Sequence, residues 1–228
     1  MSDCNEFPSR DCGTRASHDG YGKSFRIETA ECGLLELDEG KMALIVKRLD
    51  RVDGWKLPME DMCQLSDRLS EEKYRGSMKS IGKIILKQCA NSGFDALRFF
   101  EVTLFCFLTG NADMHFKNFS LIRSTDGEIQ YAAAYDLLPT TLLLSQDTEE
   151  SALTIHGKKC RFRWLDFLAF GSAFQLTERR MVNAISRFEK GLPTAIQLIQ
   201  QGFCSENMRN LYKQLVLDRW ARLMPQMP

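Results

Sequence analysis

A nearly uninterrupted apolar run, from Phe99 to Leu108, constrains the fold more than any other feature of the chain. A helix that is apolar on almost every side has to be buried among other elements. The run is too short to cross a membrane, and Glu101 interrupts it. The polar residues that follow Gly110 in quick order are Asn111, Asp113, His115 and Asn118. A buried helix that delivers a polar loop is a rigid support for a site, so we expect the chemistry of the chain to lie in this loop.

The spacing within this loop indicates a particular chemistry. Asp113 and Asn118 are five positions apart (118 − 113), the spacing of the aspartate and the asparagine in a kinase catalytic loop. In such loops the aspartate accepts the proton of the attacking hydroxyl, and the asparagine holds one Mg²⁺. A second acid, Asp136, comes after a predicted hairpin whose turn signal is Asp126-Gly127. We expect this hairpin to set Asp136 beside Asp113 and Asn118, where it would hold the metal that bridges the phosphates.

These residues also carry a family resemblance. The stretch Gly110-Asn-Ala-Asp-Met-His-Phe-Lys-Asn-Phe-Ser-Leu121, followed by Ala134-Tyr-Asp-Leu137, resembles the core of the HipA-like toxin kinases. These are bacterial Ser/Thr kinases of toxin–antitoxin systems. Weaker matches flank the core on both sides, at Ile45–Arg51 and at Ala152–Lys159. The resemblance therefore extends in order from roughly Gly33 to Trp220, and its central motif is much the most specific part.

The resemblance implies phosphoryl transfer from Mg·ATP to a Ser or Thr hydroxyl of a protein. In better-known relatives the substrates are aminoacyl-tRNA synthetases, which makes such an enzyme a candidate substrate here, and an antitoxin is an expected partner. Asp113 would be the catalytic base, while Asn118 and Asp136 would bind Mg²⁺. Because the transition state spreads negative charge over the transferred group, metal ions and positioning supply most of the rate.

The resemblance also assigns residues to the nucleotide. Lys47-Arg48-Leu49-Asp50 occupies the place of the family's hinge between lobes. There the backbone near Leu49 would meet the adenine, and Asp50 would meet the ribose hydroxyls. His115 would contact a nucleotide phosphate, and Lys117 would help to neutralise the phosphate charge.

Each of these residues also has an ordinary structural interpretation. Asp113 would cap the turn after the buried helix, Asn118 would bond its own backbone, and Asp136 would be the N-cap of a short helix over 137–144. His115 would only fix the loop, Lys117 would simply be exposed, and the 47–50 cluster would end an edge strand in solvent. The candidate residues occur together, in order and beside an apolar support, which favours catalysis over these alternatives.

One departure from the family pattern concerns the N-terminal lobe. The family's phosphate loop, and the lysine that pairs with the α- and β-phosphates, are not recognisable before Asp50; the early candidate Gly20-Tyr-Gly-Lys23 has the wrong spacing. The alternative function is therefore a catalytically incomplete kinase remnant that binds a nucleotide or a partner. A metal-dependent phosphohydrolase would need more ligands than a chain with three histidines offers. We expect a separately encoded chain to supply the small lobe.

Composition sets the outer limits. The 30 basic and 30 acidic residues cancel, so we expect neither direct nucleic-acid binding nor membrane association. The eight cysteines include no Cys-x-x-Cys pair, which indicates reduced thiols in a cytoplasmic protein rather than a metal site. We predict an α+β fold with a helical majority, like a protein-kinase C-terminal lobe with a remnant of the N-terminal lobe. Residues 1–24 would be a disordered tail, 25–57 a short β segment and hinge, and 58–228 the helical C-terminal lobe.

The expected elements follow from periodicity and from Gly, Pro and Ser positions. We predict strands at 25–28, 32–37, 42–46, 119–123 and 129–133, and a two-stranded ribbon from 153–155 and 160–162. Helices are predicted from Pro58 onward, over 78–89, over 94–108, over 178–190, from Pro193 to Gln201, and from Ser205 or Asn207 to the end. The last helix would bury Met208, Leu211, Leu215 and Trp220. A basic cluster at 158–163 is expected to be a solvated face rather than a binding surface.

Overall fold

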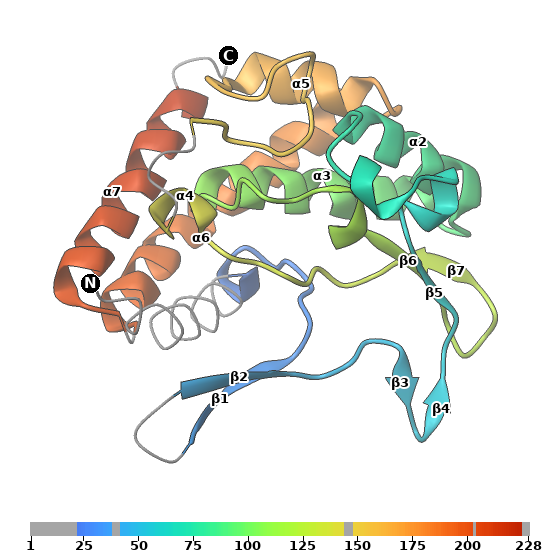
Figure 1. Ribbon diagram of the computed structural model, residues 1–228. Coiled ribbons are helices and arrows are strands. Elements are labelled where there is room, and N and C mark those ends of the chain that lie inside the picture. Colours follow the sequence, from blue (N-terminus) through green and yellow to red (C-terminus); the bar gives the residue numbers. More distant parts are fainter. Residues whose placement is uncertain (1–21, 38–41, 144–147, 203, 225–228) are drawn as a thin grey trace.

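The computed structural model describes residues 22–37, 42–143, 148–202 and 204–224. Within these ranges a helical majority and small antiparallel sheets make an α+β fold, as predicted (Figure 1). The helices are α2 (Met78–Gln88), α3 (Ser92–Thr109), α4 (Thr140–Leu143), α5 (Trp164–Ser172), α6 (Glu178–Gln201) and α7 (Glu206–Leu223). The predicted tail over 1–24 lies outside the described residues, apart from 22–24. In the described part of the chain, no helix has the length and apolar character needed to span a membrane.

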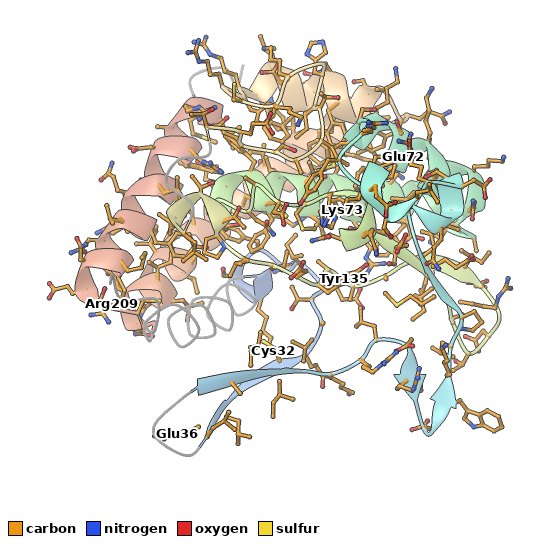
Figure 2. All side chains as sticks on the ribbon, viewed as in Figure 1. Cys32, Glu36, Glu72, Lys73, Tyr135 and Arg209 are labelled. Carbon is orange, nitrogen blue, oxygen red and sulfur yellow. The ribbon has the colours of Figure 1, made fainter. Side chains whose placement is uncertain are left out.

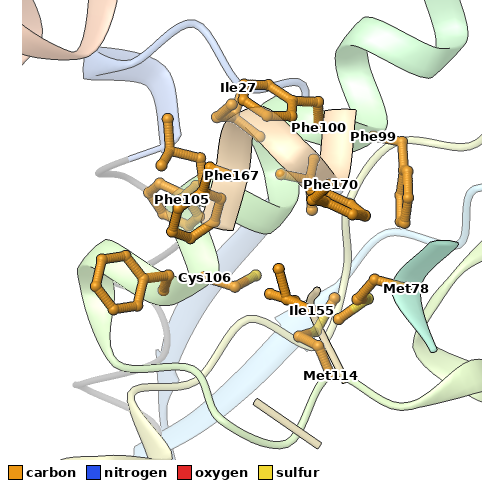
Figure 3. Close-up of a cluster of buried hydrophobic side chains, with 14 of the residues drawn as sticks. Ile27, Met78, Phe99, Phe100, Phe105, Cys106, Met114, Ile155, Phe167 and Phe170 are labelled. Atoms are coloured by element: carbon orange, nitrogen blue, oxygen red, sulfur yellow. The ribbon is translucent and has the colours of Figure 1, made fainter. Parts of the chain in front are cut away.

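Helix α3 forms the centre of the molecule and packs against α2, α6 and α7. Nearly every side chain in its second half is buried, which confirms the prediction for this segment. Phe99 belongs to a cluster of buried hydrophobic side chains (Figure 3). Its ring contacts the rings of Phe119, Tyr131, Phe170 and Phe174. Aromatic side chains bury large apolar areas, so this cluster holds α3 rigidly between the sheet and α5.

The C-terminal end of α3 is fixed by Gly110. This residue has a left-handed backbone with φ of 83°, and its N–H donates to the carbonyls of Cys106 and Phe107. A Cβ at this position would lie 2.6 Å from Cδ2 of Leu215 on α7. Glycine therefore permits both the turn and the close approach of α7. The backbone at Gly110, where the polar loop after α3 begins, is therefore held in one conformation.

The strands form separate antiparallel units. β1 (Cys32–Glu36) and β2 (Met42–Val46) form where strands were predicted, and they pair with each other; the residues between them lie outside the described ranges. β3 (Arg51–Val52) and β4 (Trp55–Lys56) form a second, short hairpin. In the third unit β6 (Ser120–Arg123) lies between β5 (Met59–Asp61) and β7 (Ile129–Tyr131), so the hairpin predicted around Asp126-Gly127 is confirmed. The strand predicted at 25–28 is wrong, because Phe25 instead turns into the core and stacks on Phe188.

The helix predicted from Pro58 is also wrong. Met59–Asp61 forms β5, and two short 3-10 helices follow, η2 (Gln64–Ser66) and η3 (Ser70–Glu72). The N–H of Met62 donates to the carbonyls of Phe116 and Phe119, at 3.2 and 3.0 Å. The backbone at the start of this segment is therefore bonded to the polar loop after α3. Leu69 would share one face of such a helix with Met62 and Leu65, but in the structure it is exposed. Pairing with β6 outweighs a local helical pattern.

The break predicted at Gly191 is absent, because α6 continues through Pro193. The residues that α6 buries before and after this point lie on one face: Met181, Ala184, Ile185, Phe188, Ala195 and Ile199. Burial of that continuous face outweighs the cost of an internal proline. Gly191 has a packing role, since a Cβ there would lie 2.3 Å from the carbonyl oxygen of Ser24.

Two expectations near the C-terminus need correction. Helix α7 begins after Ser205 as predicted, with the Ser205 side chain accepting from Met208 N–H. However, it buries Tyr212, Val216, Arg219 and Leu223, and Leu211 is half exposed. The ribbon predicted from 153–155 and 160–162 does not form; an isolated bridge joins Ile155 to Lys158. Lys158 and His156 instead contact the buried carboxylate of Asp166, at 2.7 and 3.2 Å, so this part of the basic cluster has a structural role.

Candidate active site

The polar loop after α3 is held by backbone and side-chain hydrogen bonds at its start. The N–H of Asn111 donates to the carbonyl of Cys106 at 2.9 Å. The N–H of Ala112 donates to Oγ1 of Thr140, at the start of α4, at 2.8 Å. The loop then ends in η4 (Phe116–Asn118) and leads directly into β6. Both ends of the loop are therefore attached to regular structure, which fixes the side chains between them.

Asn118 and Asp136 are in direct contact. The Nδ2 of Asn118 donates to Oδ2 of Asp136 at 2.8 Å, so the β6–β7 hairpin brings these residues together as expected. Asp136 has a left-handed backbone with φ of 54°. This conformation is costly for a residue other than glycine and concentrates at functional sites.

The contact between Asn118 and Asp136 offers one amide and one carboxylate to a cation. Among the described residues, no group of three or more His, Cys, Asp or Glu side chains is arranged to hold a metal. A magnesium ion is commonly held by one or two protein ligands together with substrate phosphates and water. The Asn118–Asp136 pair fits that kind of site and does not fit a metal cage made of protein alone.

Asp113 is held from two sides. Its backbone N–H donates to Oδ1 of Asn111 at 3.3 Å, and Nδ2 of Asn111 donates to the backbone carbonyl of Asp136, also at 3.3 Å. One Asn111 side chain therefore bridges the segments of both acids. Oδ1 of Asp113 also accepts a hydrogen bond of 2.9 Å from the hydroxyl of Tyr74. Burial, followed by the hydrogen bond to Asp113 and its charge, raises the pKa of Tyr74 to about 12.

His115 lies next to Tyr74, the hydrogen-bond partner of Asp113. It is buried, and its Nδ1 has no hydrogen-bond partner among the described residues. The edge of its ring packs against Tyr74, with the ring centroids 5.0 Å apart. Burial, and then the positive charge of Lys73, hold the pKa of His115 below its ordinary value. The imidazole is therefore neutral at neutral pH, which leaves one ring N–H as a donor.

A cavity of about 520 Å³ lies between the predicted hinge and the polar loop. Leu49 and Asp50 line it on the hinge side, and Lys117 and Tyr135 line it on the loop side. Lys117 and Tyr135 are the chain neighbours of Asn118 and Asp136, but Asn118, Asp136 and Asp113 are not among the residues that line the cavity. Figure 2 shows Tyr135 between the helical body and the β1–β2 hairpin. His115 does not line this cavity.

Asp50 is already engaged by two arginines. Arg48 donates to both oxygens of its carboxylate, at 2.9 and 2.8 Å, and Arg51 donates to Oδ2 at 2.6 Å. The hydrogen bond from Arg48 is the main reason why the pKa of Asp50 is far below its ordinary value. A ribose hydroxyl at Asp50 would therefore share this carboxylate with the arginines or displace one of them.

Two residues of the site were not found from the sequence. Tyr135 donates to the carbonyl of Lys117 at 2.9 Å and contacts Oγ of Ser120 at 2.6 Å, which ties the segment before Asp136 to the segment around Asn118. Its position next to Asp136 was the available signal. Tyr74 stands 39 residues before Asp113, in a segment predicted to be helix or helix break, and it had no such signal.

The fold and the loop define a protein of the kinase-like class. The chain matches the structure of HipA of the Shewanella oneidensis MR-1 toxin–antitoxin system, solved with HipB and its operator DNA. The TM-score is 0.77 at 19% identity, over 99% of this chain and 57% of that chain. It also matches the Helicobacter pylori proinflammatory kinase CtkA, with a TM-score of 0.70 at 17% identity, over 96% of this chain and 86% of that chain. At these identities the likeness concerns the fold.

The chain belongs to the HipA-like kinase family, because the family model described as the HipA-like C-terminal domain matches residues 21–196. Two curated relatives come from Sinorhizobium fredii. The protein named "Putative kinase Y4dM" is 34% identical over 169 residues, which is 68% of this chain and 41% of that protein. The protein named "Putative kinase Y4mE" is 33% identical over 110 residues, 44% of this chain and 26% of that protein. The chain thus spans less than half the length of these relatives.

Proposed function

We propose that this chain carries the catalytic part of a Ser/Thr protein kinase of the toxin–antitoxin type, which transfers the γ-phosphoryl group of Mg·ATP to a protein hydroxyl. The observation that carries the proposal is the hydrogen bond between Asn118 and Asp136 beside the loop of Asp113. Their chain neighbours Lys117 and Tyr135 line a cavity that begins at the hinge. Membership of the HipA-like family supports the same reaction class. An aminoacyl-tRNA synthetase is our candidate substrate, and an antitoxin resembling HipB is a candidate partner.

In this proposal three side chains act on the reacting groups. Asp113 accepts the proton of the attacking hydroxyl, and the hydrogen bond from its backbone N–H to Asn111 fixes the position of Asp113 in the loop. Asn118 and Asp136 hold Mg²⁺, together with phosphate oxygens and water. The metal would supply positive charge where the transferred group becomes more negative. The rigid end of α3 keeps these groups at fixed positions, so little reorganisation is needed when the reaction occurs.

The cavity is our candidate nucleotide site. The backbone near Leu49 would meet the adenine at the hinge, and Asp50 would meet the ribose after sharing its arginine partners. Lys117 lines the cavity and would help to neutralise the phosphates. Its Nζ now donates to Oγ of Ser70 at 3.2 Å, a contact that an anion would easily replace. His115, held neutral, would offer a single N–H to a phosphate oxygen.

One observation favours a second candidate function. The β1–β2 hairpin exposes several large apolar side chains, among them Leu35 and Ile45. In this second function the chain binds a nucleotide but does not transfer phosphate by itself. It would act as a binding module, and activity would require a partner that covers this hairpin. The two functions make different predictions for Asp113. A kinase needs Asp113 for phosphoryl transfer, whereas a binding module binds the nucleotide without any transfer that depends on Asp113.

The metal assignment can be tested by calorimetry of ATP binding with and without Mg²⁺. We expect ATP to bind weakly to the 228-residue chain alone and more tightly when Mg²⁺ is present. Asp136→Asn should remove that difference, because it replaces the charged ligand with a nearly isosteric neutral one. Asp126→Asn, a matched change at the distant β6–β7 turn, should leave the difference intact. An Asp136→Asn variant with the parent's Mg²⁺ dependence would refute the metal site.

A further inference from the structure

The hydrogen bond between Tyr74 and Asp113 joins two segments that are far apart in the sequence. Tyr74 follows η3 and precedes α2, whereas Asp113 stands in the loop after α3. The phenol oxygen lies 2.9 Å from Oδ1 of Asp113, a normal length for an O–H donor to a carboxylate. Oδ2 of Asp113 has no hydrogen bond among the described residues. The pair therefore leaves one carboxylate oxygen held and the other open.

The segment that carries Tyr74 is attached to the polar loop on both sides of the tyrosine. Before it, Lys117 Nζ donates to Oγ of Ser70, and Phe116 N–H donates to the carbonyl of Lys73 at 3.2 Å. After it, the carbonyl of Arg75 accepts from Arg68, whose guanidinium lies over the Phe116 ring at 4.5 Å. Tyr74 is therefore not a loosely tethered side chain that happens to reach an acid. Its hydroxyl is delivered to Asp113 by a segment that is bonded to the same loop.

The ring of Tyr74 is fixed independently of its hydroxyl. One contact is the edge packing against His115, and a second is Lys73, whose Nζ lies 4.9 Å from the ring centroid. Figure 2 labels Lys73 above Tyr135, in the part of the molecule where the polar loop lies. Removing the hydroxyl alone should therefore leave the ring in place. This separates the hydrogen bond to Asp113 from the packing of the segment.

We propose that Tyr74 is a positioning residue that orients the carboxylate of Asp113 for phosphoryl transfer, an inference that rests on the proposed function. A general base works best when a third group holds it, as in nucleophile–base–orienter arrangements. Here the phenol holds Oδ1, so Oδ2 faces the acceptor hydroxyl and takes its proton. Tyr74 itself exchanges no proton during the reaction. The alternative is that Tyr74 blocks the acceptor position, and the kinetic test distinguishes the two.

The first test is spectroscopic and does not depend on activity. The full chain is labelled with [¹³Cζ]tyrosine, and the Tyr74 resonance is assigned by its loss in Tyr74→Phe. Asp113→Asn should shift the Tyr74 resonance at neutral pH, because the charged acceptor of the phenol proton is gone, while the resonances of Tyr131 and Tyr212 stay in place. An unmoved Tyr74 resonance in Asp113→Asn would overturn the contact and with it the proposal.

The second test is kinetic and uses whichever preparation transfers phosphate, the chain alone or the chain with its partner. Tyr74→Phe should lower kcat by about ten-fold or more with the KM for ATP unchanged, since a misplaced base slows the chemical step without weakening nucleotide binding. Tyr212→Phe is the matched control, because it removes a tyrosine hydroxyl from α7 and leaves the segment of Tyr74 and the polar loop untouched. It should keep the parent's kcat.

Other results of the kinetic test are equally decisive. An unchanged kcat in Tyr74→Phe would overturn the positioning role, and a raised kcat would show that Tyr74 blocks the acceptor position. Phosphate found on Tyr74 by mass spectrometry would make it an acceptor and also overturn the proposal. Failure of the proposed function would look different: Asp113→Asn would retain transfer in the same preparation, whatever Tyr74→Phe does.

Discussion

Asn111 joins the two acids of the candidate site through one side-chain amide. Its Oδ1 accepts from the backbone of Asp113, and its Nδ2 donates to the backbone of Asp136, so neither segment can shift without affecting the other. The left-handed backbone of Asp136 costs about 1–2 kcal/mol for a residue with a side chain. The hydrogen bonds from Asn111 and Asn118 help to hold that conformation. The polar residues of the loop thus stabilise one another before any ligand binds.

Asp113 offers a prediction that separates chemistry from binding. Asp113→Asn should abolish phosphoryl transfer and leave the affinity for Mg·ATP within about a few-fold of the parent, because a base acts on the hydroxyl and contributes little to ground-state binding. Transfer is measured with radiolabelled ATP, and affinity by calorimetry. Retained transfer in a preparation where the parent is active would make Asp113 a structural cap and would refute the kinase interpretation of the loop.

Local spacing explains why the sequence predicted some of these residues and missed others. Asp113 and Asn118 share one loop, and the turn at Asp126-Gly127 accounts for the return of Asp136 to Asn118. Tyr74 reaches Asp113 only because η3 and its neighbours bond to the polar loop, and no local pattern indicates such a contact. The contacts of Arg48 and Arg51 with Asp50 were not predicted for a different reason. The sequence shows the three charged residues, but it does not show how their side chains are oriented.

The end of α3 is the element on which the candidate site depends most. Gly110→Ala places a side chain at φ of 83° and 2.6 Å from Leu215, a residue of α7 that packs against the core. Gly127→Ala is a matched control, because it has φ of 85° but nothing within 4 Å of its added Cβ. In urea denaturation we expect Gly127→Ala to lose about 1–2 kcal/mol of unfolding free energy from backbone strain alone.

Gly110→Ala should lose more than its control, about 1–3 kcal/mol beyond the backbone strain, because Leu215 has to move within a packed core. It should also weaken Mg·ATP binding, since the loop with Asn118 begins at this turn. Equal losses of stability in the two variants would show that the contact between Gly110 and Leu215 has no energetic importance.

At the scale of whole elements, strong periodicity made α2, α3 and α7 predictable, while tertiary contacts decided the rest. Met59–Asp61 is strand because β6 offers an unpaired edge, although Met62 and Leu65 repeat with helical spacing. Pro193 does not end α6, because Ala195 and Ile199 continue a buried face. In α7 the buried face differs from the predicted stripe and includes Arg219, which donates to the carbonyl of Phe107. None of these contacts can be seen from one segment alone.

The β1–β2 hairpin exposes apolar side chains on both of its faces. In its register Leu35 and Ile45 lie on one face, and Val46 lies on the other. These side chains are 44% to 55% exposed, and the hairpin lies apart from the helical body in Figure 1. A two-stranded hairpin that exposes apolar residues on both faces is marginally stable by itself. We therefore expect a further β-rich polypeptide to cover it, and we propose that this is the small lobe of the kinase.

That expectation gives a prediction for the whole chain. ATP carries several negative charges, and in kinases a phosphate-covering loop and its lysine hold them from the small-lobe side. In the chain described here the proposed metal ligands and Lys117 lie in the polar loop or next to it, so the phosphates would be held from that side only and transfer would be slow. Residues 1–228 alone should show little or no phosphoryl transfer with radiolabelled ATP, and should gain it when the product of an adjacent reading frame supplies the small lobe.

Leu35→Ser with Ile45→Ser should weaken that gain and improve solubility, because the exposed apolar face is where the partner would pack. As a control on the opposite side of the molecule, Leu165→Ser changes an exposed apolar residue of α5 and should leave the gain unchanged. Strong activity from the lone chain would contradict the prediction and would mean that the chain holds the phosphates without a second polypeptide.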